Sequence, residues 1–146
     1  MHPCPTLLRL ALAALLAFAA PASAQSSAQE RFLQGVALMD QQRDAAALEI
    51  FVQLTQEFPG LPDPYNNIAL LHARAGRLEE ARQALELALR NDPGHRTART
   101  NLGQVHLMLA VQSWELAAAT GPLDPQTQRL LEGARRLLDA RTAAPR

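Results

Sequence analysis

Two pairs of side chains that could do chemistry recur at one fixed interval in the sequence. His72 and His106 are separated by the same number of residues as Asn67 and Asn101. Imidazole nitrogens can ligate a metal ion, and a carboxamide can both donate a hydrogen bond to a bound peptide and accept one from it. Neither histidine has a third His or a carboxylate at a clear coordinating position nearby, so we expect half-buried, packed imidazoles and no metal or other cofactor. His95 lies in a turn, where we expect it to be solvated.

No other pattern in the sequence indicates catalysis. The sequence contains no nucleophile elbow, no phosphate-binding loop and no paired-carboxylate motif. Glu79 and Glu80 are adjacent acids at the expected start of a helix, where negative charge stabilises the positive end of the helix dipole. We therefore predict that the protein is not an enzyme.

The charge balance excludes two further classes of function. Fourteen basic residues, all of them Arg, balance fourteen acidic ones, so the formal net charge is zero. Proteins that bind nucleic acid or anionic membrane surfaces need an excess of cations. The single cysteine, Cys4, permits neither an internal disulfide nor a cysteine-ligated zinc site. A chain of 146 residues has room for one domain.

Residues 1–24 have the layout of a cleavable signal peptide. Arg9 is the only charged residue of this segment, Leu10 to Ala20 is apolar, and Ala22 and Ala24 are the small residues that precede a cleavage site. The apolar run is shorter than the roughly 20 residues that span a bilayer. We expect cleavage before Gln25 and export, to the periplasm if the source is a Gram-negative bacterium. Secretion and an uncleaved membrane anchor are the alternatives.

The rest of the sequence reads as helix, and its features recur with a fixed period. No strand-like alternation occurs, and the breaks fall mainly at Gly, Pro and Asp. The spacing from Pro59 to Pro93 equals the spacing from Ala47 to Ala81. Gly35, Ala69 and Gly103 form a series of three at the same interval. The interval is about 34 residues, which is the period of a helix-turn-helix repeat.

In this pattern the sequence closely resembles the tetratricopeptide-repeat family over about residues 28–122. The resemblance implies an all-α solenoid with repeats at about 28–61, 62–95 and 96–124, within a domain spanning 25–141. Small residues would let helices approach closely, large ones would fill the gaps between repeats, and prolines would end the second helix of each repeat. The residues assigned to this packing are Gly35, Ala47, Phe51, Pro59, Tyr65, Ala69, Ala81, Leu85, Pro93, Gly103, Ala110, Trp114 and Pro122.

The third repeat departs from the pattern because its turn is shortened. Twelve residues separate Gly35 from Ala47, but only seven separate Gly103 from Ala110. Neither Gly nor Pro occurs between Gly103 and Gly121. We therefore expect the two helices of this repeat to merge into one helix over about 97–120, with a very tight turn near 108–110 as the alternative.

A final helix over about 125–141 is predicted after the merged helix. Asp124 and Pro125 are suited to the N-cap and the first turn of that helix. Such a helix would close the last exposed interface of a repeat stack. Its apolar face would consist of Leu130, Leu131, Ala134, Leu137 and Leu138. Residues 142–146 are expected to form a loose tail.

The resemblance also implies a concave face, lined by the first helix of each repeat, that binds a segment of a partner. The matching residues are Phe32, Val36, Met39, Asn66, Asn67, Leu70, Arg74, Thr100, Asn101 and Gln104. Asn67 and Asn101 would either pair with the main chain of a peptide or form hydrogen bonds within their own repeats.

The identity of the groove residues narrows the kind of partner. Family members that clamp a C-terminal carboxylate use cations, whereas the matching positions here are Phe32, Val36, Asn67, Thr97 and Asn101. A groove of this composition favours an apolar or amphipathic segment. We therefore predict a non-catalytic interaction module of the bacterial cell envelope, whose partner is a protein or peptide and not a nucleic acid or small molecule. The alternative is a self-associating structural protein in which the merged helix forms the oligomer interface.

Overall fold

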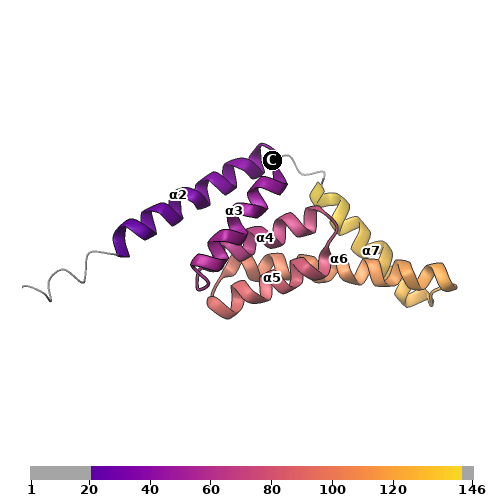
Figure 1. The fold of residues 1–146 in the computed structure, drawn as a ribbon. Helices are drawn as coiled ribbons and strands as arrows, with labels where there is room; N and C mark the ends of the chain where they lie inside the picture. The colour runs from indigo at the N-terminus through magenta and orange to yellow at the C-terminus, as the bar shows by residue number, and fades with distance from the viewer. Residues whose placement is uncertain (1–20, 143–146) are drawn as a thin grey trace, which may run out of the picture. The chain divides into compact units, whose positions relative to one another are not determined.

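The computed structural model describes the backbone of residues 21–142, which forms six helices and no strand in that range. The helices are α2 (Pro21–Asp40), α3 (Asp44–Glu57), α4 (Pro62–Arg74), α5 (Leu78–Asn91), α6 (Arg96–Thr120) and α7 (Pro125–Thr142) (Figure 1). The predicted signal peptide lies outside the described residues up to position 20, and so does Cys4. Residues 143–146 of the predicted tail lie outside them as well.

The chain forms two compact units. Of the described residues, those up to Ile50 belong to the first unit and those from Phe51 onward belong to the second, so α3 contributes to both. In the first unit, Leu38 and Met39 of α2 and Ala47 of α3 are buried. Among the described residues, no helix is both long enough and apolar enough to cross a membrane.

The turn between α4 and α5 is closed by two backbone hydrogen bonds around a glycine. Gly76 has a φ of +73°, in the left-handed region that suits glycine. Its N–H donates to the carbonyl of Ala73 (3.0 Å), and the N–H of Arg77 donates to that of His72 (2.9 Å). This is the Schellman arrangement, which satisfies the last carbonyls of a helix and turns the chain.

The same turn occurs one repeat length earlier, with glutamine in place of glycine. Gln42 has a φ of +59° and donates its N–H to the carbonyl of Met39, while Arg43 donates to that of Leu38. The periodicity thus extends to the backbone conformation of the turns. The left-handed conformation of Gln42 was not indicated by its residue type, because a side chain with a Cβ is strained there.

The loops that connect successive repeats are also alike. The N–H of Leu61 donates to Phe58 in the loop after α3, and that of His95 donates to Asp92 in the loop after α5. A side-chain hydrogen bond joins the two loops, from Asn91 Nδ2 to the carbonyl of Pro59 (2.7 Å). Helices α3, α5 and α6 end before Pro59, Pro93 and Pro122, as expected of residues that cannot continue a helix.

The core of the second unit is formed where α5 packs against both α4 and α6. Ala81, Leu85 and Ala88 of α5 have no exposed surface, and Ala69 of α4 is 1% exposed. Small residues at 69 and 81 are consistent with close approach of the two helices, and Leu85 contributes bulk between them and the next helix. Phe51 and Leu54 of α3 are fully buried, and Tyr65 of α4 is partly buried.

Helix α6 runs without interruption from Arg96 to Thr120 and extends past the ends of α4 and α5 (Figure 1). The merged helix predicted for the third repeat is therefore the observed one, and no turn forms near 108–110. The prediction that Gly103 permits close packing is wrong. Gly103 is exposed, and a Cβ at this position would meet no atom within 4 Å. The reason is that no helix folds back onto this part of α6 in the way that α5 folds back onto α4.

Helix α7 packs against the second half of α6. Asp124 caps α7 by accepting the N–H groups of Gln126 (2.9 Å) and Thr127 (3.1 Å) at its Oδ1. A small core forms around Val111, Leu131 and Ala134, with partial burial of four neighbours, Leu107, Trp114, Leu123 and Leu138. Trp114 therefore packs between α6 and α7 and not in a gap between repeats.

The apolar face predicted for α7 is only partly correct. Leu131, Ala134 and Leu138 contact the core with α6, but Leu130 is 51% exposed and Leu137 is 63% exposed. These two leucines each precede a core residue by one position, which rotates them about 100° away from α6.

The two matched turns predict opposite effects of exchanging their left-handed residues. Gly76→Ala is expected to lower the free energy of unfolding by about 1 kcal/mol, because alanine is strained at positive φ. Gln42→Gly relieves the same strain and is expected to raise the free energy of unfolding by a few tenths of a kcal/mol. The gain is small because glycine also gives the unfolded chain more conformational freedom. Urea unfolding of both variants measures these changes, and equal signs would contradict the shared turn geometry.

Candidate functional site

A buried pair of asparagines joins α4 to α6. Asn101 Nδ2 donates to Asn66 Oδ1 at 2.8 Å, across 35 residues of sequence. Asn66 is 6% exposed, and it is the only buried polar residue among those that the structure describes. A buried carboxamide needs a hydrogen-bond partner, so the pair fixes the positions of the two helices along each other. The prediction that Asn66 contacts a partner is therefore corrected: its main contact is with Asn101.

Asn67 lies beside this pair and is partly buried. Its Nδ2 donates to the carbonyl of Asp63 in the preceding turn of α4 (3.1 Å). Of the two roles left open for the asparagines, the structure shows Asn67 bonded within its own repeat and Asn101 bonded to the preceding one. Each bond uses one N–H group, and a carboxamide has a second N–H and an oxygen with two lone pairs. The carboxamides keep the capacity to bind further groups.

The surface around the asparagine pair is largely uncharged. Leu70 of α4 and Gln104 of α6 are partly buried, and Thr100 is exposed with its hydroxyl donating to the carbonyl of Arg96 (3.1 Å). Arg74, at the last turn of α4, is the one charged member of the predicted set in this unit. We refer to the surface formed by Asn67, Leu70, Thr100, Asn101 and Gln104 as the amide face.

The remaining predicted groove residues belong to α2, in the first unit. Phe32 and Val36 are partly buried, and Met39 is 7% exposed. Met39 is thus a core residue of that unit, and the prediction that it contacts a partner is corrected. Met39 was assigned to the groove because it matches a position of the family, but its side chain is buried near the end of α2.

At one end of α4 and α6, His95 forms a polar connection that the sequence did not indicate. Its Nε2 lies 3.0 Å from Asp63 Oδ1, and its Nδ1 accepts the N–H of Ala98 (3.0 Å) at the start of α6. Because Nδ1 accepts, Nε2 carries the proton and donates to the carboxylate. The expectation of a solvated His95 is therefore wrong. Its position just before α6, where side chains cap helices, was the available signal.

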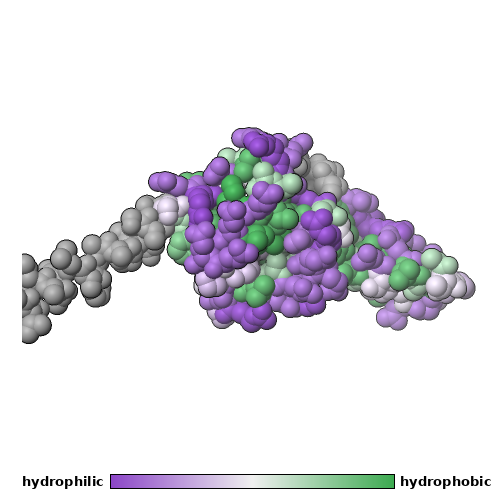
Figure 2. All heavy atoms as spheres, in the orientation of Figure 1, coloured by the Kyte–Doolittle hydropathy of each residue, from purple (hydrophilic) through white to green (hydrophobic). Residues whose placement is uncertain are grey.

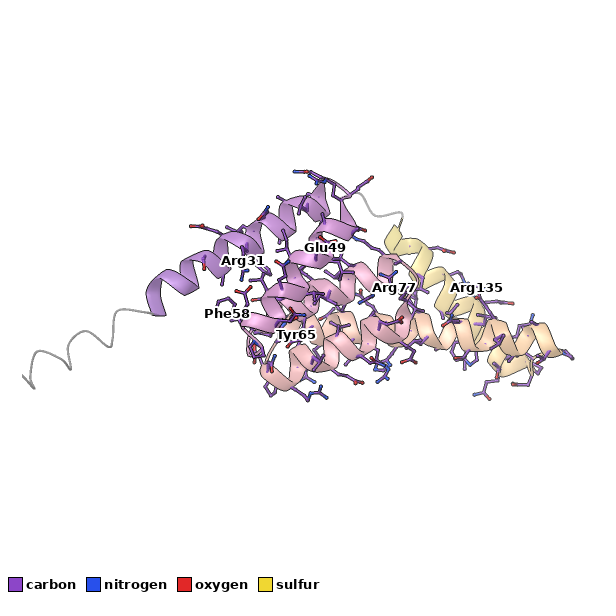
Figure 3. The ribbon with its side chains drawn as sticks, in the orientation of Figure 1. Arg31, Glu49, Phe58, Tyr65, Arg77 and Arg135 are labelled. Carbon is purple, nitrogen blue, oxygen red and sulfur yellow. The ribbon has the colours of Figure 1, made fainter. Side chains whose placement is uncertain are left out.

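The two histidines at matching repeat positions have different environments. His72 is partly buried at the end of α4, and its Nδ1 accepts Arg77 Nε at 2.9 Å, at the start of α5 (Figure 3). His106 is exposed, contrary to the expectation that both imidazoles are half-buried. The side chains described contain no group of three or more His, Cys, Asp or Glu positioned to hold a metal ion.

Burial and charge both act on His72. Burial lowers the pKa of this imidazole below its usual value of 6.5, and the nearby Arg77 guanidinium lowers it further, while Glu80 opposes them. Both dominant effects disfavour the cationic form. His72 therefore favours a neutral ring that accepts a hydrogen bond from Arg77.

Comparison with known proteins finds similarity to tetratricopeptide-repeat proteins in both sequence and structure. Residues 38–105 match the tetratricopeptide repeat family. The tetratricopeptide-repeat domain of Sgt2 from Aspergillus fumigatus is similar in structure, with a TM-score of 0.56, 23% identity, and coverage of 82% of this chain and 85% of that one. No curated protein shows a significant match to the sequence.

A second structural relative is a peptide complex. The first tetratricopeptide-repeat domain of Spaghetti (RPAP3), bound to the HSP90 peptide SRMEEVD, has a TM-score of 0.54 and 17% identity. The match covers 77% of this chain and 95% of that domain. At these identities the two structural matches establish the similarity of the fold.

His72 predicts a specific pH dependence of stability. Because its pKa is lowered in the folded protein, the unfolded chain binds more protons below about pH 6.5, so stability falls as pH decreases through that range. His72→Gln retains an acceptor for Arg77 and is expected to reduce this fall between about pH 7 and 5. Urea unfolding at several pH values measures it, with His106→Gln as the matched control. A pH slope unchanged in His72→Gln would contradict the assignment.

Proposed function

Because the chain carries tetratricopeptide repeats, we propose that it is a non-catalytic interaction module that holds a segment of a partner protein against the amide face. The observation that carries this proposal is the Asn66–Asn101 bond, which fixes α4 and α6 beside each other. The partly buried side chains of Leu70 and Gln104 flank the bonded pair. A surface that is already ordered binds with a smaller loss of conformational entropy.

The composition of the amide face favours an uncharged segment. The peptide bound to the Spaghetti domain, SRMEEVD, contains three acidic residues. Here the positions expected to meet such charges in the second unit are Asn67, Thr97 and Asn101, which carry no cation. A peptide that offers main-chain groups to the carboxamides and apolar side chains to Leu70 fits this surface better.

The size of the surface limits the strength of the interaction. Only α4 and α6 contribute the amide face, and each helix supplies little more than one turn to it. Such an interface falls at or below the class of about 1,200 Å² of total buried area, which is typical of transient contacts. We therefore infer a weak and reversible interaction.

We further propose that the interaction occurs in the bacterial cell envelope. The support comes from the sequence of residues 1–24, with one cation, a short apolar run and small residues at 22 and 24. Removal before Gln25 would take only the first four residues of α2 and leave its part from Gln25 to Asp40. That part includes the buried Ala28, Leu38 and Met39, so the contribution of α2 to the first unit does not require the removed residues.

Site-specific crosslinking in intact cells tests the proposal. The full-length chain is expressed in a Gram-negative host with a photo-crosslinking amino acid at Gln104 on the amide face, or at Gln83 on α5 as the matched control. Gln83 is exposed and Gln104 is partly buried, and neither belongs to the buried core of the protein. We expect crosslinks to a defined partner from Gln104 only, in the periplasmic fraction, and a processed chain whose mass corresponds to residues 25–146.

A blocking substitution adds a second readout. Thr100→Arg places a long cation on the exposed edge of the amide face and is expected to reduce the Gln104 crosslink about tenfold or more, which corresponds to about 1.4 kcal/mol. Gln83→Arg adds the same charge to α5 and should leave the crosslink intact. Equal crosslinking from both positions, or insensitivity to Thr100→Arg, would exclude the amide face as the binding site. A cytoplasmic, unprocessed chain would exclude only the envelope location.

A further inference from the structure

One side of α6 is uncovered because the third repeat has no helix that folds back onto it. In the second unit, Ala69 is 1% exposed and His72 is partly buried. The residues at the matching positions of the third repeat, Gly103 and His106, are both exposed. The same positions of the repeat are thus buried or partly buried in the second repeat and exposed in the third. The difference follows from α6 continuing straight through the position where a turn would reverse the chain.

The uncovered side of α6 consists of small, uncharged residues at regular intervals. Gly103, Ala110 and Ala117 are spaced by one heptad, so they lie along one side of the helix, with His106 and Ser113 between them. All five are exposed or partly exposed. Apart from the imidazole, the row carries no titratable side chain.

Two exposed leucines of α7 lie on the same side of the α6–α7 pair. Leu130 and Leu137 each precede a core residue by one position, just as His106 and Ala110 precede the core residues Leu107 and Val111. In antiparallel helices, residues that precede the core positions share one flank. Figure 2 shows apolar surface at this end of the molecule, among polar residues.

An ion pair between the two helices lies on the opposite flank. Glu115 and Arg135 each follow a core residue, Trp114 and Ala134, and Arg135 donates two hydrogen bonds to Glu115 Oε1 at 2.9 and 2.6 Å (Figure 3). This ion pair marks the polar flank of the two helices. The flank formed by Gly103, Ala110, Ala117, Leu130 and Leu137 is called the leucine flank below.

We propose that the leucine flank binds the leucine flank of a second copy of this chain in a two-fold symmetric dimer. Leu130 and Leu137 are one heptad apart, about 10.5 Å along α7, and the small residues of α6 repeat at the same distance. Leucines of one copy therefore match the spaces over Gly103, Ala110 or Ala117 of the other, as knobs fit into holes. A surface that carries both features is complementary to itself, which a two-fold interface requires.

Charge and size support a second copy as the occupant. The Glu115–Arg135 ion pair lies on the other flank, so this pair does not enter the contact between two leucine flanks. Helix α7, with 18 residues, is about 27 Å long, and two adjacent helices are about 20 Å wide. The flank therefore offers roughly 500 Å² per copy, or about 1,000 Å² in total, the lower limit for a specific interface. A dissociation constant in the micromolar range is expected.

Analytical ultracentrifugation of the purified chain across the micromolar range tests the dimer. The wild-type chain is expected to shift from monomer to dimer with concentration, and the double variant L130E/L137E to remain monomeric, because four carboxylates would meet at the interface. Leu116→Glu is the matched control. Leu116 is 70% exposed on α6 and lies two positions after the core residue Trp114, about 200° around the helix, on the side that faces away from α7 and outside the leucine flank.

A second variant probes the α6 half of the flank without altering the leucines. Ala117 is exposed, so Ala117→Arg should fold, and we expect it to weaken dimerisation at least tenfold with unchanged helicity. A wild-type chain that stays monomeric at the highest concentration would overturn the proposal. So would a dimer that survives L130E/L137E, or one that Leu116→Glu dissociates to the same extent. The two proposals are tested separately, because L130E/L137E alters only α7 and leaves the residues of the amide face unchanged.

Discussion

The structure depends on where the backbone can close the end of a helix and reverse direction. Reversal requires that the last carbonyls find new N–H partners, usually around a residue in the left-handed conformation. This chain meets that condition at Gln42 and again, one repeat later, at Gly76. One repeat length after Gly76, where the shortened third repeat lacks turn residues, the chain lies inside α6 and the helical hydrogen bonds continue. The array of hairpins therefore ends in a long helix, and α7 returns along it only after Gly121 and Pro122.

Polar contacts between residues about one repeat length apart stabilise the second unit in addition to its apolar core. Asn91 bonds to Pro59, His95 to Asp63, and Asn101 to Asn66, each across 32 to 35 residues of sequence. These contacts connect the loops after α3 and α5 and connect helix α4 to helix α6. The amide face is the surface next to the last of these contacts, so the hydrogen bonds that order the repeats also order the proposed binding surface.

The sequence was sufficient for features that depend on spacing along the chain. The repeat period, the cap at Asp124 and the merged helix all follow from residue types at defined positions. It was insufficient where the outcome depends on which helix lies next to a residue. Gly103 has the type and spacing of a close-packed residue but is exposed because no helix returns to cover it. Asn66 was assigned to a partner from its matching repeat position, and its pairing with Asn101 could not be foreseen because it forms only in the folded chain.

The central claim is the continuity of α6, because it leaves the leucine flank uncovered and determines where the repeat array ends. It is tested most directly by the distance between spin labels at the exposed positions Thr97 and Ala119, measured in chains diluted with unlabelled protein. A continuous helix separates these residues by about 33 Å, because each residue adds about 1.5 Å to its length. A helix that reversed near 108–110 would bring them within about 15 Å, since packed helices lie about 8–10 Å apart. A narrow distribution at the longer distance is the predicted result, and a dominant short distance would contradict the account.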